Sequence, residues 1–177
     1  MRIQGKRISV QTATFDDRIK TRIHRFSEEL LKYAEPGKPV KSVAEEKEWW
    51  RYEIVSGKQA IFTIYLADDT IIGFINVFGF NRERGDCESG IVIFPPENYG
   101  HGYGGEAYKL LLPYLKETYG LKSTYVFVAL ENTQAIRLFE KLGFGHQDTV
   151  TFDNQPWLRM TYDLENNHGC RADGLTP

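Results

Sequence analysis

Apolar residues in the first part of the chain form one strand-like run and then one helical stripe. Arg7–Thr12 is typical of a short strand. The apolar residues that follow recur every three or four positions, which is the spacing of one face of an α-helix. They are Ile19, Ile23, Phe26 and Leu30. Pro36–Pro39 must end this helix, because proline cannot continue one.

A second helix is predicted to begin just after Ser42. Ser42 and Glu45 form a capping-box pattern, in which each side chain can bond the backbone N–H of the other residue. Ser56-Gly57 marks the expected end of this helix. Its predicted buried face comprises Val43, Trp50 and Ile54.

Three compact runs of β-forming residues follow the second helix. They are Ala60–Leu66, Ile71–Phe80 and Cys87–Phe94, and short polar turns separate them. Strands joined by connections this short can pair only antiparallel. The sequence therefore predicts an antiparallel meander in the middle of the chain.

The glycine cluster that follows Pro95-Pro96 opens a third helix. The apolar stripe of this helix consists of Tyr103, Ala107, Leu110, Leu111 and Tyr114. Pro113 lies inside the stripe and is expected to kink or shorten the helix, because it removes one hydrogen bond. Thr124–Leu130 is almost wholly apolar, which is typical of a strand buried on both faces.

The last part of the chain predicts a helix and a hairpin. The helical stripe contains Ala135, Leu138, Phe139 and Leu142. Gly143 is expected to close it. Val150–Phe152 and Trp157–Leu164 are candidate strands of a final hairpin. The fold class is therefore α+β, with one domain over residues 1–164 and a polar tail, expected to be disordered, over residues 165–177.

Composition and charge exclude several classes of function. The 177 residues carry a net charge of −2, so no basic face indicates nucleic-acid binding, and Lys6-Arg7 is interpreted as ordinary solvated surface. Cys87 and Cys170 are too few for a disulfide framework, which favours a reducing compartment. The four histidines have no metal-ligand spacing, so no metal site is predicted. The chain has no signal-like segment and no run of membrane-spanning length, so we expect a cytoplasmic protein with no membrane partner.

Four glycines between a strand and a helix predict a phosphate site. They are Gly100, Gly102, Gly104 and Gly105. Glycine lets backbone N–H groups approach a ligand closely. The helix start behind them offers unpaired N–H donors and partial positive charge. The alternative is a flexible turn between the strand and the helix.

Two other phosphate-binding motifs compete for this segment. Gly100–Gly105 also fits the dinucleotide pattern G-x-G-x-x-G, and Glu131 follows as a late candidate for the ribose-binding acid. That motif opens a doubly wound sheet, whereas here a meander precedes it and few elements follow it. A nucleoside-triphosphate loop needs Gly-Lys-Ser/Thr at its end, but Glu106 follows Gly105.

Two motifs together resemble the GNAT N-acetyltransferases. The first signature of that family is Arg/Gln-x-x-Gly-x-Gly/Ala, and here the segment reads Tyr99-Gly100-His101-Gly102-Tyr103-Gly104. The second is a helix-starting Asn, then an aromatic residue and Gly-Phe, for which Asn132, Phe139 and Gly143-Phe144 stand here. The segment from Glu88 to Ile93 is similar to the branch of ribosomal-protein N-terminal and small-amine acetyltransferases.

The resemblance implies a GNAT-like domain that uses acetyl-CoA as co-substrate. Its mixed, mostly antiparallel sheet would have six to seven strands flanked by about four helices. The pantetheine arm would pair with the strand backbone at Ile91, Val92 and Ile93. The other implied cofactor-binding residues are Tyr99, Gly100, His101, Gly102, Tyr103, Gly104, Gly105, Asn132 and Phe139.

Two positions depart from the family pattern. Tyr99 replaces the usual Arg/Gln, so its side-chain contact to the pyrophosphate is not carried over, although the backbone cradle does not depend on it. Phe139 replaces the Tyr that many members use as general acid, and Phe has no proton to give. Because a thiolate with a pKa of about 8.5 is a tolerable leaving group, the loss of this acid is survivable.

Glu88 is the predicted catalytic residue. An alkyl ammonium with a pKa of about 10 must lose a proton before it attacks the thioester, and a positioned carboxylate can take that proton. Glu88 lies on the strand that leads to the phosphate loop, and Asp86 and His146 are weaker candidates. Cys87 is interpreted as a core residue.

The acceptor is predicted to be a primary amine, with a protein or peptide N-terminus as the first reading. Its α-amine pKa is near 8, against about 10.4 for a lysine-like amine, and is easier to deprotonate. The alternatives are a polyamine, amino sugar or aminoglycoside, or a CoA-binding sensor without turnover. Trp49, Trp50 and Trp157 are candidate walls of the acceptor site. The aromatic surface could also support a homodimer.

Overall fold

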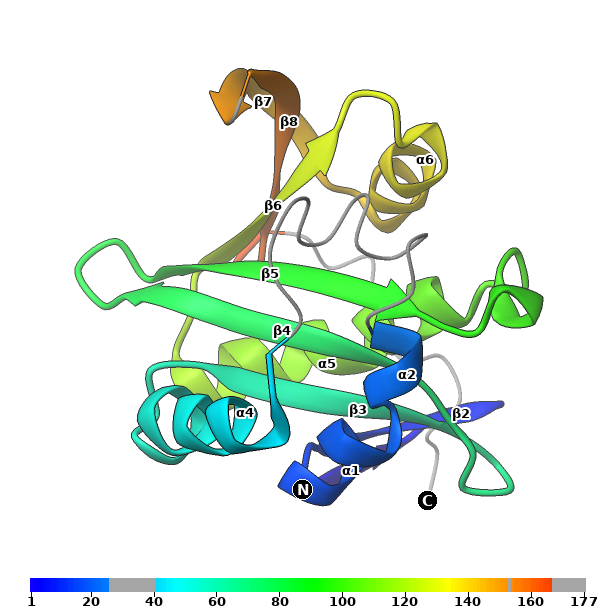
Figure 1. Cartoon of the computed structure of the whole chain (residues 1–177). Coiled ribbons are helices and arrows are strands. Elements are labelled where there is room, and N and C mark those ends of the chain that lie inside the picture. Colours follow the sequence, from blue (N-terminus) through cyan, green and yellow to red (C-terminus); the bar gives the residue numbers. More distant parts are fainter. Residues whose placement is uncertain (26–40, 153, 167–177) are drawn as a thin grey trace.

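The computed structural model describes residues 1–25, 41–152 and 154–166 and places all of its strands in one sheet (Figure 1). The sheet has eight strands in the order β1-β2-β3-β4-β5-β6-β8-β7. This is the mixed, mostly antiparallel α+β architecture that the sequence predicts, with more strands than the six to seven expected. The additional strand is β1 (Arg2–Gln4) at one edge of the sheet, and no sequence pattern predicted it.

The predicted three-strand meander is confirmed, and two strands before it extend the antiparallel pairing. β2 (Ile8–Thr12), β3 (Ala60–Leu66), β4 (Ile71–Asn81) and β5 (Asp86–Ile93) each pair antiparallel with the strand before. Short turns join β3 to β4 and β4 to β5 and leave no other arrangement, which is why the prediction succeeds there. Residues 13–59 separate β2 from β3, so turn length did not predict that pairing.

The remaining strands are joined to the meander by one crossover. β6 (Ser123–Ala129) runs parallel to β5, and α5 (Tyr103–Tyr119) connects the two. β8 (Gln155–Asp163) pairs antiparallel with both β6 and β7 (Gly145–Phe152). The predicted final hairpin is therefore confirmed, with longer strands than the pattern indicated.

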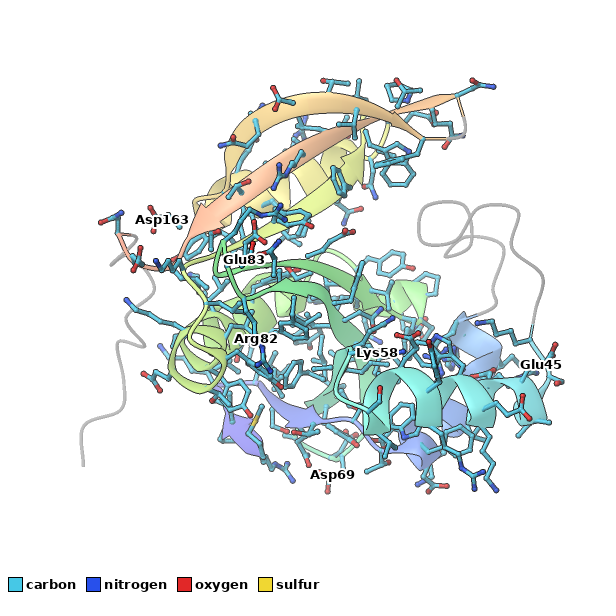
Figure 2. All side chains as sticks on the ribbon, turned by 90° about the vertical axis from the view of Figure 1, so that its left-hand side faces the viewer. Glu45, Lys58, Asp69, Arg82, Glu83 and Asp163 are labelled. Carbon is cyan, nitrogen blue, oxygen red and sulfur yellow. The ribbon has the colours of Figure 1, made fainter. Side chains whose placement is uncertain are left out.

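Helices cover both faces of the sheet. The short helices α1 (Phe15–Lys20), α2 (Arg22–Arg25) and α4 (Val43–Trp49) lie in front of it in Figure 1, and α5 lies behind it. Figure 2, turned by 90°, has α5 on the left of the sheet and α4 on the right. The remaining helical elements are the π-helix η1 (Trp50–Val55), the 3-10 helix η2 (Pro96–Asn98) and α6 (Thr133–Leu142). Gly143, in a left-handed conformation, ends α6.

The first predicted helix is interrupted within its described part, and one of its predicted buried residues is exposed. The chain forms two short helices that separate at Thr21, and Ile23 is 79% exposed. Thr21 hydroxyl bonds to the Asp17 carbonyl, which competes with a regular continuation of the helix. Phe26, Leu30 and the break at Pro36–Pro39 lie outside the described residues, as do Cys170 and most of the tail.

The second predicted helix has the expected start and an unexpected core residue. Ser42 and Glu45 form the reciprocal capping box. Val43 is exposed, whereas Trp50 and Ile54 pack at the edge of a small core cluster beside Phe74 and Phe94. The fully buried residue of α4 is Glu46, so a charged side chain occupies the position that apolar patterning passes over.

Two further expectations are corrected along α5 and β6. Pro113 does not shorten α5, which continues for 17 residues and ends at Gly120. β6 is not buried on both faces: Thr124, Val126 and Val128 are buried, while the residues between them are only partly covered. Within the described part of the chain, no helix is both long and apolar enough to cross a membrane.

Candidate active site

The sheet opens where β5 and β6 separate. Their parallel pairing covers Asp86–Glu88 against Ser123–Tyr125 and stops there. β5 continues to Ile93 along β4, and β6 continues to Ala129 along β8. In Figure 1, β6 climbs away from β5, so the two strands diverge from Glu88 onward. This divergence leaves one backbone edge of Ile91–Ile93 facing the opening, as expected for the predicted pantetheine strand.

The glycine loop stands at the end of this opening. Gly100 has φ +76° and Gly102 has φ +80°, a left-handed conformation that L side chains rarely adopt. Gly102 is the N-cap of α5, and no side chain caps this helix start. The first intrahelical bond runs from Glu106 N–H to Gly102 O. The earlier N–H groups of the first turn therefore have no intrahelical acceptor, which suits them to bind an anion.

The two later glycines allow three elements to pack at the loop. A β-carbon on Gly104 would lie 3.4 Å from Leu138 Cδ2 on α6 and 3.6 Å from Ile91 Cδ1 on β5. One on Gly105 would lie 3.5 Å from Leu138 Cδ1. The structure therefore brings the loop, the splayed strand and α6 together. Leu138, read from the sequence only as part of a helical stripe, is the α6 contact to this loop.

The two residues predicted on α6 have different surroundings. Asn132 is the N-cap of α6, and its Oδ1 accepts a hydrogen bond from Ala135 N–H at 3.1 Å. Phe139 is 4% exposed and packs edge-on against Tyr108 and Phe144. The side chain at position 139 thus belongs to the aromatic core beside the loop.

Glu88 is the last residue of β5 that pairs with β6. Its register partner is Tyr125, and the guanidinium of Arg159 on β8 lies 4.2 Å above the Tyr125 ring. Burial raises the pKa of Glu88 to about 7, although the positive charge of Arg159 acts in the opposite direction. A β-carbon at Gly90, two residues along the same face, would meet no atom within 4 Å. Glu88 therefore combines a raised pKa with open space at the apex of the splay.

The weaker candidates for the base are occupied by other contacts. Asp86 is buried and bonded by Arg84 Nε at 2.8 Å and Nη2 at 3.2 Å. His146 lies on β7, with Nε2 at 2.9 Å from Glu140 Oε1. Both groups already have charged partners away from the splay, which leaves Glu88 as the better-placed carboxylate.

Cys87 lacks the character of a nucleophile. Its side chain is fully buried, and burial raises the pKa of its thiol to about 11. A thiol is reactive as the thiolate, so this environment disfavours covalent catalysis at Cys87. No cluster of His, Cys, Asp and Glu among the described residues could hold a metal ion.

One contact at the glycine loop had no sign in the sequence, and three tryptophans were predicted as acceptor-site walls from pattern alone. Arg7 is exposed, as the sequence interpretation has it, but it also contacts the glycine loop: its Nη1 donates to His101 O at 2.8 Å. Trp49 and Trp50 pack against the small core cluster, and Trp157 pairs with Ala129 across the β6–β8 ladder. Nothing in the local sequence signals the Arg7 contact, because its partners lie more than 90 residues away.

Comparison with known proteins gives one family and a consistent set of relatives. The family model described as an acetyltransferase (GNAT) domain matches residues 7–145. A spermidine N(1)-acetyltransferase of Vibrio cholerae is 28% identical over 140 residues, covering 76% of this chain and 80% of that protein. A spermine/spermidine N(1)-acetyltransferase of Bacillus subtilis is 28% identical over 153 residues, covering 84% of this chain and 94% of that protein.

Solved structures confirm the fold. The spermidine N-acetyltransferase from Vibrio cholerae in complex with CoA and spermine superposes with a TM-score of 0.81 at 21% identity, covering 91% of this chain and 98% of that one. A structure described as dodecameric, of spermidine N-acetyltransferase from the same organism, gives a TM-score of 0.78 at 20% identity, covering 93% and 98%.

Proposed function

This chain belongs to the GNAT acetyltransferase family, and on that premise we propose that its acceptor is a polyamine of the spermidine or spermine class. Apart from the identity of the acceptor, the activity is that of an acetyl-CoA-dependent N-acetyltransferase acting on an amine. The observation that carries the proposal is that two curated relatives, from different organisms and 28% identical over most of the chain, are both named for polyamine acetylation. These relatives favour the small-amine alternative over the protein N-terminus that sequence reasoning placed first.

The proposed base is Glu88. A primary amine of a polyamine resembles a lysine amine, with a pKa of about 10.4, and is almost wholly protonated near neutrality. A carboxylate with a pKa of about 7 is a better proton acceptor than an ordinary glutamate, because proton transfer to it is less uphill. The open space at Gly90 leaves room for a substrate on the same face as Glu88. In this scheme Glu88 takes the proton, and the freed amine can then attack.

Acetyl-CoA, when bound, supplies an activated acetyl group whose carbonyl carbon the amine nitrogen attacks as the C–S bond breaks. The attacking nitrogen loses its remaining excess proton as the amide forms, and the thiolate, with an ordinary thiol pKa of about 8.5, takes up a proton through water, so that free thiol and amide are the products. Phe139 cannot donate that proton and is buried in the core. The scheme therefore assigns base catalysis to the protein and no acid catalysis to position 139.

The cofactor-binding residues proposed from the motifs fit an anionic, extended ligand. The uncapped start of α5 offers backbone N–H groups to the diphosphate, and Gly100 and Gly102 supply the left-handed turns that aim them. Ile91–Ile93 offers a strand edge to the pantetheine arm. Asn132 lies at the start of α6, whose Leu138 packs on the same loop.

We expect spermidine and spermine to give a higher kcat/KM than any other amine. The measurement is thioester cleavage with acetyl-CoA and a panel that adds lysine, short peptides with small N-terminal residues, an amino sugar and an aminoglycoside. A preference for the peptides would return the acceptor to a protein N-terminus. Binding of acetyl-CoA without turnover of any amine would instead indicate a sensor.

Self-association stays a prediction for this chain. One solved relative is described as dodecameric. Light scattering of the purified protein, with and without spermidine, would give its assembly size, and a monomer under both conditions would contradict the expectation.

A further inference from the structure

The turn between β1 and β2 is docked on the first turn of α5. Gly5 N–H bonds to Ile8 O at 2.8 Å and closes this turn. A β-carbon at Gly5 would stand 2.8 Å from both Glu106 Oε1 and Leu110 Cδ1, which is closer than real β-carbons come. Glycine at this position therefore lets the turn approach the helix closely enough for its next residues to reach the phosphate loop.

Arg7 uses this approach to contact both sides of Gly102. Its Nη1 donates to the carbonyl of His101 at 2.8 Å, and its guanidinium lies 5.0 Å from the centre of the Tyr103 ring. A β-carbon on Gly102 would be 3.6 Å from Arg7 Nη2. The arginine thus lies against the segment of the loop whose left-handed backbone directs the N–H groups.

Arg7 also binds the acidic residue of the helix start. Arg7 Nε donates to Glu106 Oε2 at 2.8 Å, and the Arg7 backbone N–H donates to Glu106 Oε1 at 2.9 Å. The Glu106 side chain is 16% exposed and the Arg7 side chain 51% exposed, so solvent screens the Arg7 charge more than that of Glu106. A carboxylate in the first turn stabilises a helix, yet it also repels a diphosphate bound there.

The loop itself contains no lysine or arginine. Residues 99–105 are Tyr, Gly, His, Gly, Tyr, Gly and Gly, so backbone dipoles are its main source of positive potential. Arg7 brings a guanidinium to this loop, where its Nη1 donates to the His101 carbonyl.

From these contacts we propose that Arg7 is a positioning residue for the diphosphate of acetyl-CoA. It holds the loop through the His101 carbonyl and cancels the charge of Glu106, so that the helix start attracts the anion. This inference rests on the assignment of the glycine loop to the diphosphate. It adds a residue 92 positions before Tyr99 to the machinery of the site, across the interface of β1–β2 with α5.

The test compares two acetyl donors that differ in the diphosphate. S-acetylpantetheine carries the same thioester as acetyl-CoA and lacks the nucleotide. We expect Arg7→Ala to raise KM for acetyl-CoA about 10- to 100-fold, the worth of one charge-assisted contact, with kcat unchanged. Its turnover of S-acetylpantetheine should equal that of the wild type, which also shows that the variant is folded. Lys6→Ala removes the same charge from the neighbouring exposed residue. It should leave KM and kcat unchanged for both donors.

A second variant isolates the charge of Glu106. In Arg7→Ala/Glu106→Gln the repelling carboxylate is gone, so KM for acetyl-CoA should recover part of the loss. Equal losses with both donors, no loss with either, or a double variant no better than Arg7→Ala would each overturn the proposal. A wild type that does not prefer acetyl-CoA over S-acetylpantetheine would overturn the glycine-loop assignment as well, and this result is separable from the others because no variant is involved.

Discussion

We expect Glu88→Gln to lower kcat/KM for the amine by about 10²- to 10⁴-fold, the usual worth of a general base. Gln keeps the size and polarity of the side chain and removes its ability to take a proton. The dissociation constant of acetyl-CoA should stay nearly unchanged, because Glu88 lies at the apex of the splay and the glycine loop lies at its other end. Steady-state kinetics and calorimetry on the same preparation measure the two quantities.

The pH profile distinguishes a base from a structural residue. Burial raises the pKa of Glu88 to about 7, so the carboxylate that accepts the proton forms as the pH rises through that value. The wild-type kcat/KM should therefore show a break near pH 7, in addition to the rise that deprotonation of the amine imposes on every variant. Glu88→Gln should keep only the second feature. Glu83→Gln, in the exposed β4–β5 turn labelled in Figure 2, is the matched control and should retain both.

Thermal stability gives an independent check on the same group. A carboxyl whose folded pKa lies above its unfolded value of about 4.3 is stabilising while protonated, and that stability is lost as pH rises from about 4.3 through 7. Glu88→Gln has no such loss. Its Tm should exceed that of the wild type at pH 8, and the difference in Tm should narrow at pH 5.

If Glu88→Gln retains most of its kcat/KM at every pH, Glu88 is not the base, and water removes the proton from the amine.

Local patterns predicted the parts of this fold that depend on neighbours in sequence. The meander follows from turn lengths, and the bounds of β3 are those of the predicted strand. The capping box at Ser42, the glycine cap of α6 and the glycine loop are each encoded within a few residues. The candidate cofactor site was readable for the same reason, since both of its motifs lie at element starts and ends.

Features that depend on distant partners were not readable. Arg7 looks like solvated surface until Glu106, 99 residues away, is brought beside it. The sequence placed Glu88 on the strand that leads to the glycine loop, but it could not show that the ladder between β5 and β6 stops at this residue. The peptide N-terminus was placed first largely on amine basicity, whereas the relatives favour a small amine. Basicity is a weak guide, because an enzyme can offset it with a raised carboxylate pKa such as that of Glu88.

Glu46 is the clearest case of a buried polar group that patterning passes over. Its side chain is 0% exposed, and it is paired with three arginines from α1 and α2. Arg18 Nε and Arg25 Nη2 lie 3.0 and 2.6 Å from Oε2, and Arg22 Nε lies 3.0 Å from Oε1. Arg18 also stacks over Trp49 at 4.3 Å. One carboxylate therefore ties α4 to both short N-terminal helices.

We expect Glu46→Ala to lower the free energy of unfolding by about 3–5 kcal/mol, the cost of removing one partner from a buried ion pair. Three guanidinium groups, whose side chains are 10–32% exposed, would lose their shared carboxylate at a site that solvent reaches only in part. The six-residue α1 is too short to hold its position by helix propensity. Urea denaturation measures the loss. Glu48→Gln, on the exposed side of the same helix, is the control and should change stability by less than about 0.5 kcal/mol. Because α1 and α2 cover the face of the sheet that carries Glu88, the loss should extend to activity at temperatures where the variant is still folded. A loss of stability below about 1 kcal/mol, the value of an exposed pair, would show that the arginines hold these helices without Glu46.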